Sequence, residues 1–86
     1  MVEESDSLEN LKYLLGNMGV DILFAIGEGA KDFEMIKIFS GLPLICVKGR
    51  IPVLLELDLV NVINDEYYLT EKGLRFKKKM NSHKKK

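Results

Sequence analysis

The chain has 86 residues, of which 47% are hydrophobic and 30% are charged, with one cysteine and a formal net charge of zero. This length allows one domain with a single small core, and the composition excludes a wholly disordered chain and a disulfide or cysteine-cluster zinc framework. The sequence contains no apolar run of about 18 residues, and its acidic start MVEESDS is unlike a secretion signal, so we expect a cytoplasmic protein with no membrane span.

The charges are distributed unevenly along the chain. Residues 1–71 contain five Lys or Arg against thirteen Asp or Glu, whereas residues 72–86 contain eight basic and no acidic residues. The two parts therefore carry formal charges of −8 and +8. A basic end of this kind fits either a polyanionic partner or a merely solvated terminus, and the sequence leaves both readings open.

The N-terminal part predicts two helices. Asp6 and Glu9 have the spacing of a capping box, which places a helix start just after Asp6. Gly16 and Gly19 predict a break, after which a second apolar helix runs to Gly27 or Gly29. The first helix has an apolar face at steps of three and four residues, formed by Leu8, Leu11, Leu15 and Met18.

The middle of the chain predicts two helices joined by a short turn. Asp32 is a suitable N-cap for a third helix that ends at Ser40 and Gly41, with Phe33, Ile36 and Phe39 expected to face inward. Pro43 then opens a fourth helix toward Asp58, because a proline in the first turn loses no hydrogen bond. The expected inward stripe of the fourth helix is Val47, Ile51, Leu54 and Leu55.

Pro52 lies inside the predicted fourth helix, three residues after Gly49. A proline there removes one backbone hydrogen bond and clashes with the preceding turn. We therefore expect a kink or an interruption near residues 49–51. This feature either re-aims the first half of the helix or is a tolerated defect, and the sequence does not decide between them.

The last part predicts a hairpin followed by a helix. Residues 59–63 and 67–69 have strand-forming side chains, and Asn64 and Asp65 between them favour a tight turn. Thr70 is the expected N-cap of a final helix whose inner stripe is Gly73, Phe76 and Met80. We expect one domain over residues 1–80 and a disordered basic tail over residues 81–86.

Several stretches together resemble a known family. The stretch LKYLLGNMGVDILFAIGEGAKDFEMIKIFSG, the helix ending in LLELDLV and the segment YYLTEKG resemble the winged-helix regulators of the arsenic-repressor (ArsR) and multiple-antibiotic-resistance (MarR) type. The resemblance covers about residues 8–76. It implies an α+β, mostly helical domain, a winged helix-turn-helix with a small antiparallel β-hairpin as its wing. In such regulators the fourth helix enters the major groove, and the first and last helices often form a two-fold dimer.

The resemblance leads to the hypothesis of a DNA-binding transcriptional regulator that acts on double-stranded DNA as a homodimer. Its fourth helix would contact bases and phosphates, the hairpin turn would touch the sugar-phosphate backbone, and the basic tail would add affinity that depends steeply on salt. The expected DNA-contacting residues are Lys37, Ser40, Leu44, Ile45, Lys48, Arg50, Asn64, Lys77, Lys78 and Lys79.

The outward side of the fourth helix departs from a typical DNA-reading surface. Only Lys48, flanked by Arg50, offers strong hydrogen-bond donors, so we expect sequence readout to depend on phosphates and thymine methyl groups. Leu44, Ile45 and Pro52 would form an exposed apolar patch. This patch supports the alternative hypothesis of a winged-helix protein–protein interaction module within a larger assembly.

The remaining expectations concern self-association and chemistry. The apolar faces of the first and last helices exceed what a core of this size needs, so we expect them to pair between chains. The residues expected at that dimer interface are Leu8, Leu11, Leu15, Phe76 and Met80. Cys46 and His83 are single, so no metal is expected, and Cys46 is expected to be a small buried hydrophobic residue. No motif for a nucleophile with its base, a carboxylate pair or a phosphate-binding loop is present, so we expect neither enzymatic activity nor a cofactor.

Overall fold

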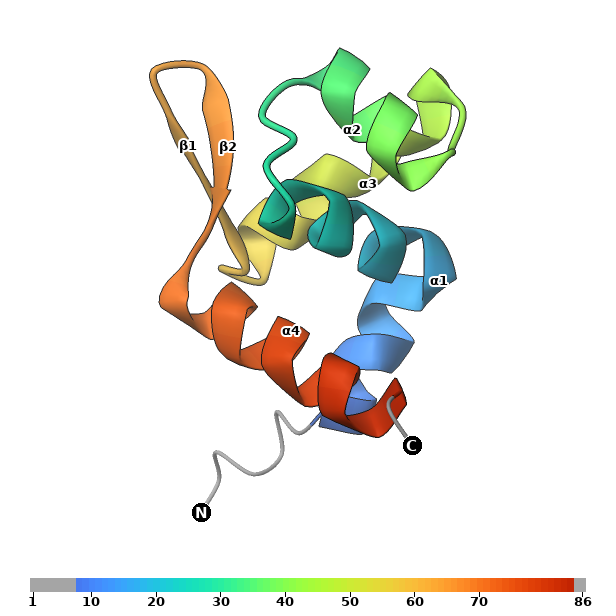
Figure 1. The fold of residues 1–86 in the computed structure, drawn as a ribbon, viewed down its shortest axis with the longest axis vertical. Coiled ribbons are helices and arrows are strands. Elements are labelled where there is room, and N and C mark those ends of the chain that lie inside the picture. Colours follow the sequence, from blue (N-terminus) through green and yellow to red (C-terminus); the bar gives the residue numbers. More distant parts are fainter. Residues whose placement is uncertain (1–7, 85–86) are drawn as a thin grey trace.

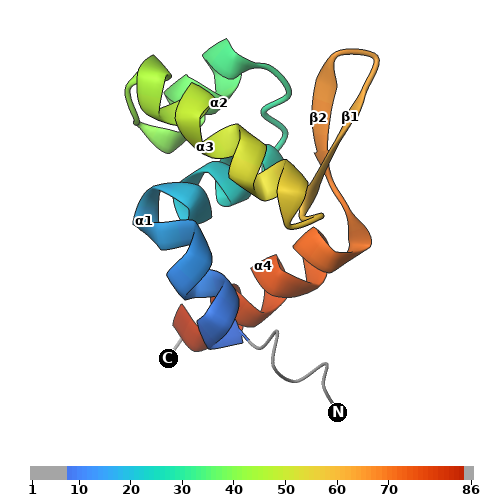
Figure 2. The same cartoon turned by 180° about the vertical axis from the view of Figure 1, so that it is seen from behind.

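The computed structural model describes residues 8–84, a range that contains four helices and one two-stranded antiparallel sheet (Figures 1 and 2). The prediction of a mostly helical chain is confirmed, and so is the hairpin that follows the fourth predicted helix. The layout is compatible with a winged helix-turn-helix. The elements are α1 Leu8–Gly27, α2 Phe33–Ser40, α3 Leu44–Glu56, β1 Val60–Ile63, β2 Glu66–Leu69 and α4 Glu71–Lys84.

Helix α1 consists of two helical arms that meet at Gly16. Gly16 has φ 72° and ψ 173°, a backbone conformation that is essentially restricted to glycine. The predicted break between two N-terminal helices is therefore confirmed at this residue. Gly19, in contrast, is helical and buried. A Cβ atom added at Gly19 would lie 2.9 Å from the Cβ atom of Leu15, so this position has no room for a side chain. The first arm lies beside α4, and the second arm lies beside α2 and α3 (Figure 1).

The core lies where α1 meets α3 and α4. Two side chains that we expected to face inward are outside this core: Phe39 is 47% exposed and Leu55 is 37% exposed. Each lies at the edge of its helix's apolar face, beyond the part that neighbouring elements cover. The buried apolar residues are Leu11, Leu15, Ile22, Leu23, Ala25, Ile26, Ala30, Ile36, Val47, Ile51, Leu54, Leu59, Val60, Phe76 and Met80.

We predicted a kink or an interruption near residues 49–51, and α3 continues through Pro52 without an interruption. Val47, Ile51 and Leu54 are buried along its inner side, whereas Pro52 is exposed. The carbonyl group that loses its hydrogen bond belongs to Lys48, which is also on the exposed side. Water can therefore satisfy this carbonyl, and the helix continues.

The hairpin has a two-residue turn at the predicted position. Asn64 and Asp65 have φ angles of 53° and 67°, which define a tight turn whose twist matches that of the strands. Val60 pairs with Leu69 at the base of the hairpin. The amide of Tyr67 also donates to the carbonyl oxygen of Lys31 at 3.0 Å, so the loop before α2 is bonded to β2.

The base of the hairpin connects α3 to α4. The amide of Thr70 donates to the carbonyl oxygen of Leu59 at 3.0 Å, and the Thr70 hydroxyl donates to the carbonyl oxygen of Asp58 at 2.6 Å. The same hydroxyl accepts from the amide of Gly73 at 3.0 Å, which confirms Thr70 as the N-cap of α4. Helix α4 then continues to Lys84, beyond the end that we expected. The predicted cap Asp6 and residues 85–86 of the predicted tail lie outside the described residues.

Candidate nucleic-acid interface

Helices α2 and α3 are joined by the three-residue turn 41–43, and the chain bends by 106° between them. Asp32 caps α2 as predicted, because its side chain accepts from the amide of Met35 at 2.8 Å. Gly41 ends α2 with φ 76°, and its amide donates to the carbonyl oxygen of Lys37. Two helices at this angle with a short glycine-containing turn have the geometry of a helix-turn-helix.

Ser40 belongs to this turn. Its hydroxyl donates to the carbonyl oxygen of Lys37 at 3.4 Å and accepts from the amide of Leu42 at 3.2 Å. Ser40 is half-buried, whereas Lys37 is exposed. Both residues were expected to contact the DNA backbone. Only the Lys37 side chain extends into solvent, whereas the Ser40 hydroxyl stabilises the turn.

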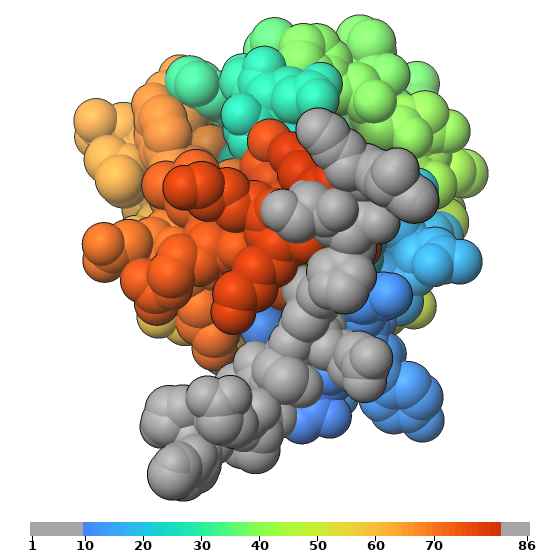
Figure 3. All heavy atoms as spheres, turned by 60° about the horizontal axis from the view of Figure 1, so that its bottom comes forward, coloured from blue at the N-terminus to red at the C-terminus, as the bar shows by residue number. Residues whose placement is uncertain are grey.

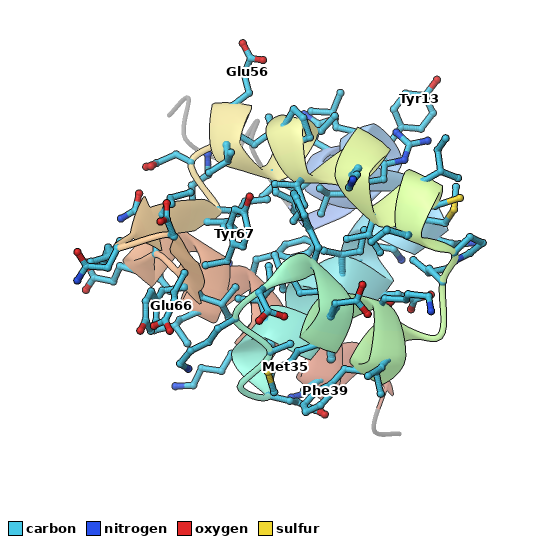
Figure 4. All side chains as sticks on the ribbon, turned by 90° about the horizontal axis from the view of Figure 1, so that it is seen from above. Tyr13, Met35, Phe39, Glu56, Glu66 and Tyr67 are labelled. Carbon is cyan, nitrogen blue, oxygen red and sulfur yellow. The ribbon has the colours of Figure 1, made fainter. Side chains whose placement is uncertain are left out.

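The outermost ridge of α3 carries no side-chain hydrogen-bond donor. It consists of Ile45, Gly49, Pro52 and Glu56, which are all exposed and are spaced four, three and four residues apart. Ile45 is 79% exposed, and Glu56 points away from the body of the molecule (Figure 4). This ridge can contact apolar groups, but it cannot donate hydrogen bonds to base edges.

Lys48 and Arg50 lie on different sides of this ridge. Residues two positions apart on an α-helix are rotated by about 200° from each other around the helix axis. Lys48 is exposed, and its Nζ atom lies 5.6 Å from the centre of the Phe33 ring, on the side of α3 that faces the N-terminus of α2. Arg50 is half-buried on the other side. The two expected cationic contacts therefore cannot act on one groove as a pair.

An aromatic junction connects the hairpin to the two helices. The Phe33 and Tyr67 rings lie 5.7 Å apart, and Figure 4 shows Tyr67 reaching from the hairpin toward the helices. The Nζ atom of Lys31 lies 4.8 Å from the centre of the Tyr68 ring. Cations over aromatic faces are attracted by the ring electrons. The junction thus places Lys31 and Lys48 near the hairpin, an arrangement with no signal in the sequence because it joins distant positions.

The hairpin tip is acidic. Asn64 is exposed as expected, but its neighbours Asp65 and Glu66 are exposed carboxylates. The Tyr68 hydroxyl donates to Glu66 at 2.7 Å, and this hydrogen bond to a carboxylate raises the pKa of Tyr68. A phosphate at Asn64 would approach both carboxylates, so the tip itself is a poor anion site.

The lysines of α4 lie apart from this surface. Helix α4 crosses the face of the molecule shown in Figure 3. Helix α3 lies toward the viewer in Figure 2, which shows the molecule from another side. Lys78 and Lys79 are exposed, but Lys77 is half-buried with its Nζ atom 5.3 Å from the centre of the Phe24 ring. The structure therefore separates the expected DNA-contacting residues into one group on α2, α3 and the hairpin and another on α4.

A second apolar surface, which we did not predict, lies on α2. Met35, Ile38 and Phe39 are 38%, 70% and 47% exposed, and their spacing places them on one side of the helix. Figure 4 shows Met35 and Phe39 on the side of the molecule opposite to Glu56 of α3. The sequence signal for this stripe was present, because the segment FEMIKIF has more apolar residues than one buried face can take.

The expected dimer residues have partners within one chain. Leu11, Leu15, Phe76 and Met80 are buried in the core that α1 and α4 share. Within one chain these four side chains are therefore already covered, because the bend at Gly16 lets the first arm of α1 pack along α4. The side chain of Leu8 lies outside the described residues. Tyr13 and Leu14, on the outer side of the same arm, are 86% and 53% exposed.

Among residues 10–81, whose side chains the structure describes, no three His, Cys, Asp or Glu lie where they could hold a metal ion together. Cys46 is half-buried. Within the described range, no helix alone is both long and apolar enough to cross a membrane, and α2 and α3 reach that length and composition only when counted together across their 106° bend.

Comparison with protein-family models gives no match, and comparison with curated proteins gives no significant match.

Proposed function

We propose that this chain is a winged helix-turn-helix protein that binds double-stranded DNA and regulates transcription. The observation that supports the proposal is the 106° bend across the three-residue turn between α2 and α3, with the hairpin beside α3 (Figure 2). In proteins with this geometry the second helix enters the major groove. The hairpin would then serve as the wing, attached to α2 through Phe33 and Tyr67.

The contacts of this interface would be mainly with phosphates. Lys37 and Lys48 are exposed and can neutralise backbone charges, while Ile45 can contact thymine methyl groups in the groove. The ridge of α3 offers no bidentate pairing with a base. We therefore expect low sequence selectivity and a binding constant that falls steeply with salt.

We further propose that the protein acts as a homodimer in the cytoplasm, where it would meet DNA. The buried residues of α1 and α4 are not available for the dimer contact. The exposed outer side of the first arm of α1, with Tyr13 and Leu14, is the apolar surface next to that core. A dimer through this surface would present two copies of α3, as two-fold DNA-binding proteins do.

Fluorescence anisotropy with a short random-sequence duplex, measured over a salt series, tests the DNA-binding proposal. Replacing Lys48 by Gln should weaken binding and flatten the slope of log affinity against log salt by about 0.9, the contribution of one phosphate contact. The matched control is Lys12→Gln, which removes an exposed lysine from α1. Equal effects of the two substitutions, or no binding by the unaltered protein at low salt, would contradict the proposal.

The second candidate function is a winged-helix protein-interaction module. It is favoured by Ile45 on α3 and by the stripe of Met35, Ile38 and Phe39 on α2, since exposed apolar patches mark interaction sites. On this hypothesis Ile45→Asp abolishes binding to a partner, whereas reversing Lys48 and Arg50 to Glu leaves it intact. DNA binding predicts the opposite ranking of these variants, and insensitivity to all three changes would contradict both functions.

A further inference from the structure

The positive charge of the molecule is concentrated on α4 and not on the helix-turn-helix. Helix α4 contains six basic residues and one acidic residue. Residues 31–69, which include α2, α3 and the hairpin, contain four basic and six acidic residues. Because DNA attracts proteins through its phosphates, α4 is electrostatically the better attachment surface.

Three of these basic residues form one exposed patch. Lys78 and Lys79 lie three and four residues after Arg75, so all three share the side of α4 that faces solvent. Two other lysines of the helix are engaged within the chain. Lys72 donates to the carbonyl oxygen of Leu57 at 3.0 Å, and Lys77 lies over the Phe24 ring. We call Arg75, Lys78 and Lys79 the α4 patch.

The α4 patch and the outer ridge of α3 belong to different faces of the molecule. Helix α1 packs against both helices, with its second arm beside α3 and its first arm beside α4 (Figure 1). Helix α4 crosses the face shown in Figure 3, while the outward side of α3 faces the viewer in Figure 2. The outward side of α3 and the α4 patch therefore do not face in the same direction.

We propose that the α4 patch is a second DNA-binding surface, which takes a second duplex segment while α3 and the hairpin hold the first. One chain then bridges two segments of DNA. This inference rests on the proposed function, because it assumes that α3 binds a duplex. The contacts at the α4 patch are with phosphates only, so binding at this surface is independent of sequence and weakens as the salt concentration rises.

A co-capture experiment tests the proposal with the full chain. One random-sequence duplex is fixed to beads, protein is added, and a second, fluorescent duplex is offered after washing. The quantity measured is fluorescent duplex retained per bound protein. We expect the unaltered chain to retain the second duplex, and Arg75→Glu with Lys78→Glu and Lys79→Glu to reduce retention to the level of beads without protein.

The control variant is Lys78→Arg with Lys79→Arg, which keeps the charge and should retain the second duplex. A melting curve followed by circular dichroism checks that each variant is folded. Retention by the triple Glu variant equal to that of the unaltered chain would overturn the proposal and point to bridging by a dimer with two copies of α3. Loss of retention in the Arg variant would also overturn it. Protein that binds the beads without retaining a second duplex contradicts this inference alone, whereas protein that never binds the beads contradicts the proposed function itself.

Discussion

Gly73 lies directly against the backbone of Leu59. A Cβ atom at this position would overlap the carbonyl oxygen of Leu59, which accepts from the amide of Thr70. The oxygen cannot move without breaking the base of the hairpin. We expect Gly73→Ala to destabilise the fold by about 3 kcal/mol, the upper part of the usual range for overpacking. Urea unfolding measures this change.

Gly49 provides the control for that substitution. It lies inside α3, is exposed, and has open space where a Cβ atom would be added. Gly49→Ala should therefore stabilise the protein by about 1 kcal/mol, the difference in helix propensity. The two glycine-to-alanine substitutions should thus change the free energy of unfolding in opposite directions. A stabilising Gly73→Ala would show that α4 does not lie against Leu59.

The hydrogen bond from Tyr68 to Glu66 predicts a dependence on alkaline pH. Because this bond raises the pKa of Tyr68 in the folded chain, its contribution to stability is present below the ordinary tyrosine pKa and is lost as the pH rises through the raised value. We expect Glu66→Gln to lower the pKa of Tyr68, as measured by NMR titration. Asp65→Asn, which leaves the hydrogen bond in place, should shift it less. Equal shifts in both variants would exclude the hydrogen bond as the cause.

Sequence reasoning was most successful where one residue acts on its immediate neighbours. Asp32, Thr70 and the pair Asn64–Asp65 were assigned as caps and turn residues, and their hydrogen bonds and φ angles confirm these roles. The contact between Gly73 and Leu59 was missed, because it joins two elements whose packing is not encoded in local spacing. Gly73 was assigned only to the inner stripe of its helix.

At the scale of elements, Thr70 connects the hairpin to α4. Its hydroxyl both donates to Asp58 and accepts from Gly73. Replacing it by Ala removes both bonds and should cost about 1–2 kcal/mol in the free energy of unfolding. Thr70→Ser keeps the hydroxyl and should cost much less. A loss of stability in the Ser variant as large as in the Ala variant would mean that the methyl group, not the hydroxyl, is important.

The elements themselves were largely predictable, but their environment was not. Apolar periodicity identified Val47, Ile51 and Leu54 as the inner stripe of α3, and the glycines at 16 and 19 predicted the break that α1 has at Gly16. It could not tell that Phe39 and Leu55 lie just outside the core, because periodicity gives the direction of a buried face and not its width. Nor could it tell that exposed Pro52 would be accommodated within α3.

At the scale of the whole molecule, the main question is self-association. If the outer side of the first arm of α1 forms the proposed dimer, Leu14→Asp should convert it to a monomer, because a buried unpaired carboxylate is strongly unfavourable at an apolar contact. Sedimentation equilibrium measures the change in mass. Leu55→Asp is the control, since Leu55 is a partly exposed leucine on α3. A monomer before substitution, or an equal effect of both variants, would rule out this interface.

The candidate site was predictable in outline only. The sequence placed Lys48 on the outward side of α3 and Asn64 at the hairpin tip, and both positions are as expected. It could not show that Lys77 would lie over Phe24, or that α4 would lie across another face of the molecule. The expected dimer residues illustrate the same limit, because the apolar content of a helix does not reveal whether its partner is in the same chain.

The packing of α4 on the first arm of α1 also affects how the chain folds during synthesis. Leu11 and Leu15 leave the ribosome with the first helix, but Phe76 and Met80, which share their core, emerge only after the hairpin. The contacts between α1 and α4 close a long loop, which costs conformational entropy. The contacts that offset this cost cannot form until α4 has been synthesised. During translation the first arm of α1 therefore exposes an apolar face, which is covered only when α4 docks.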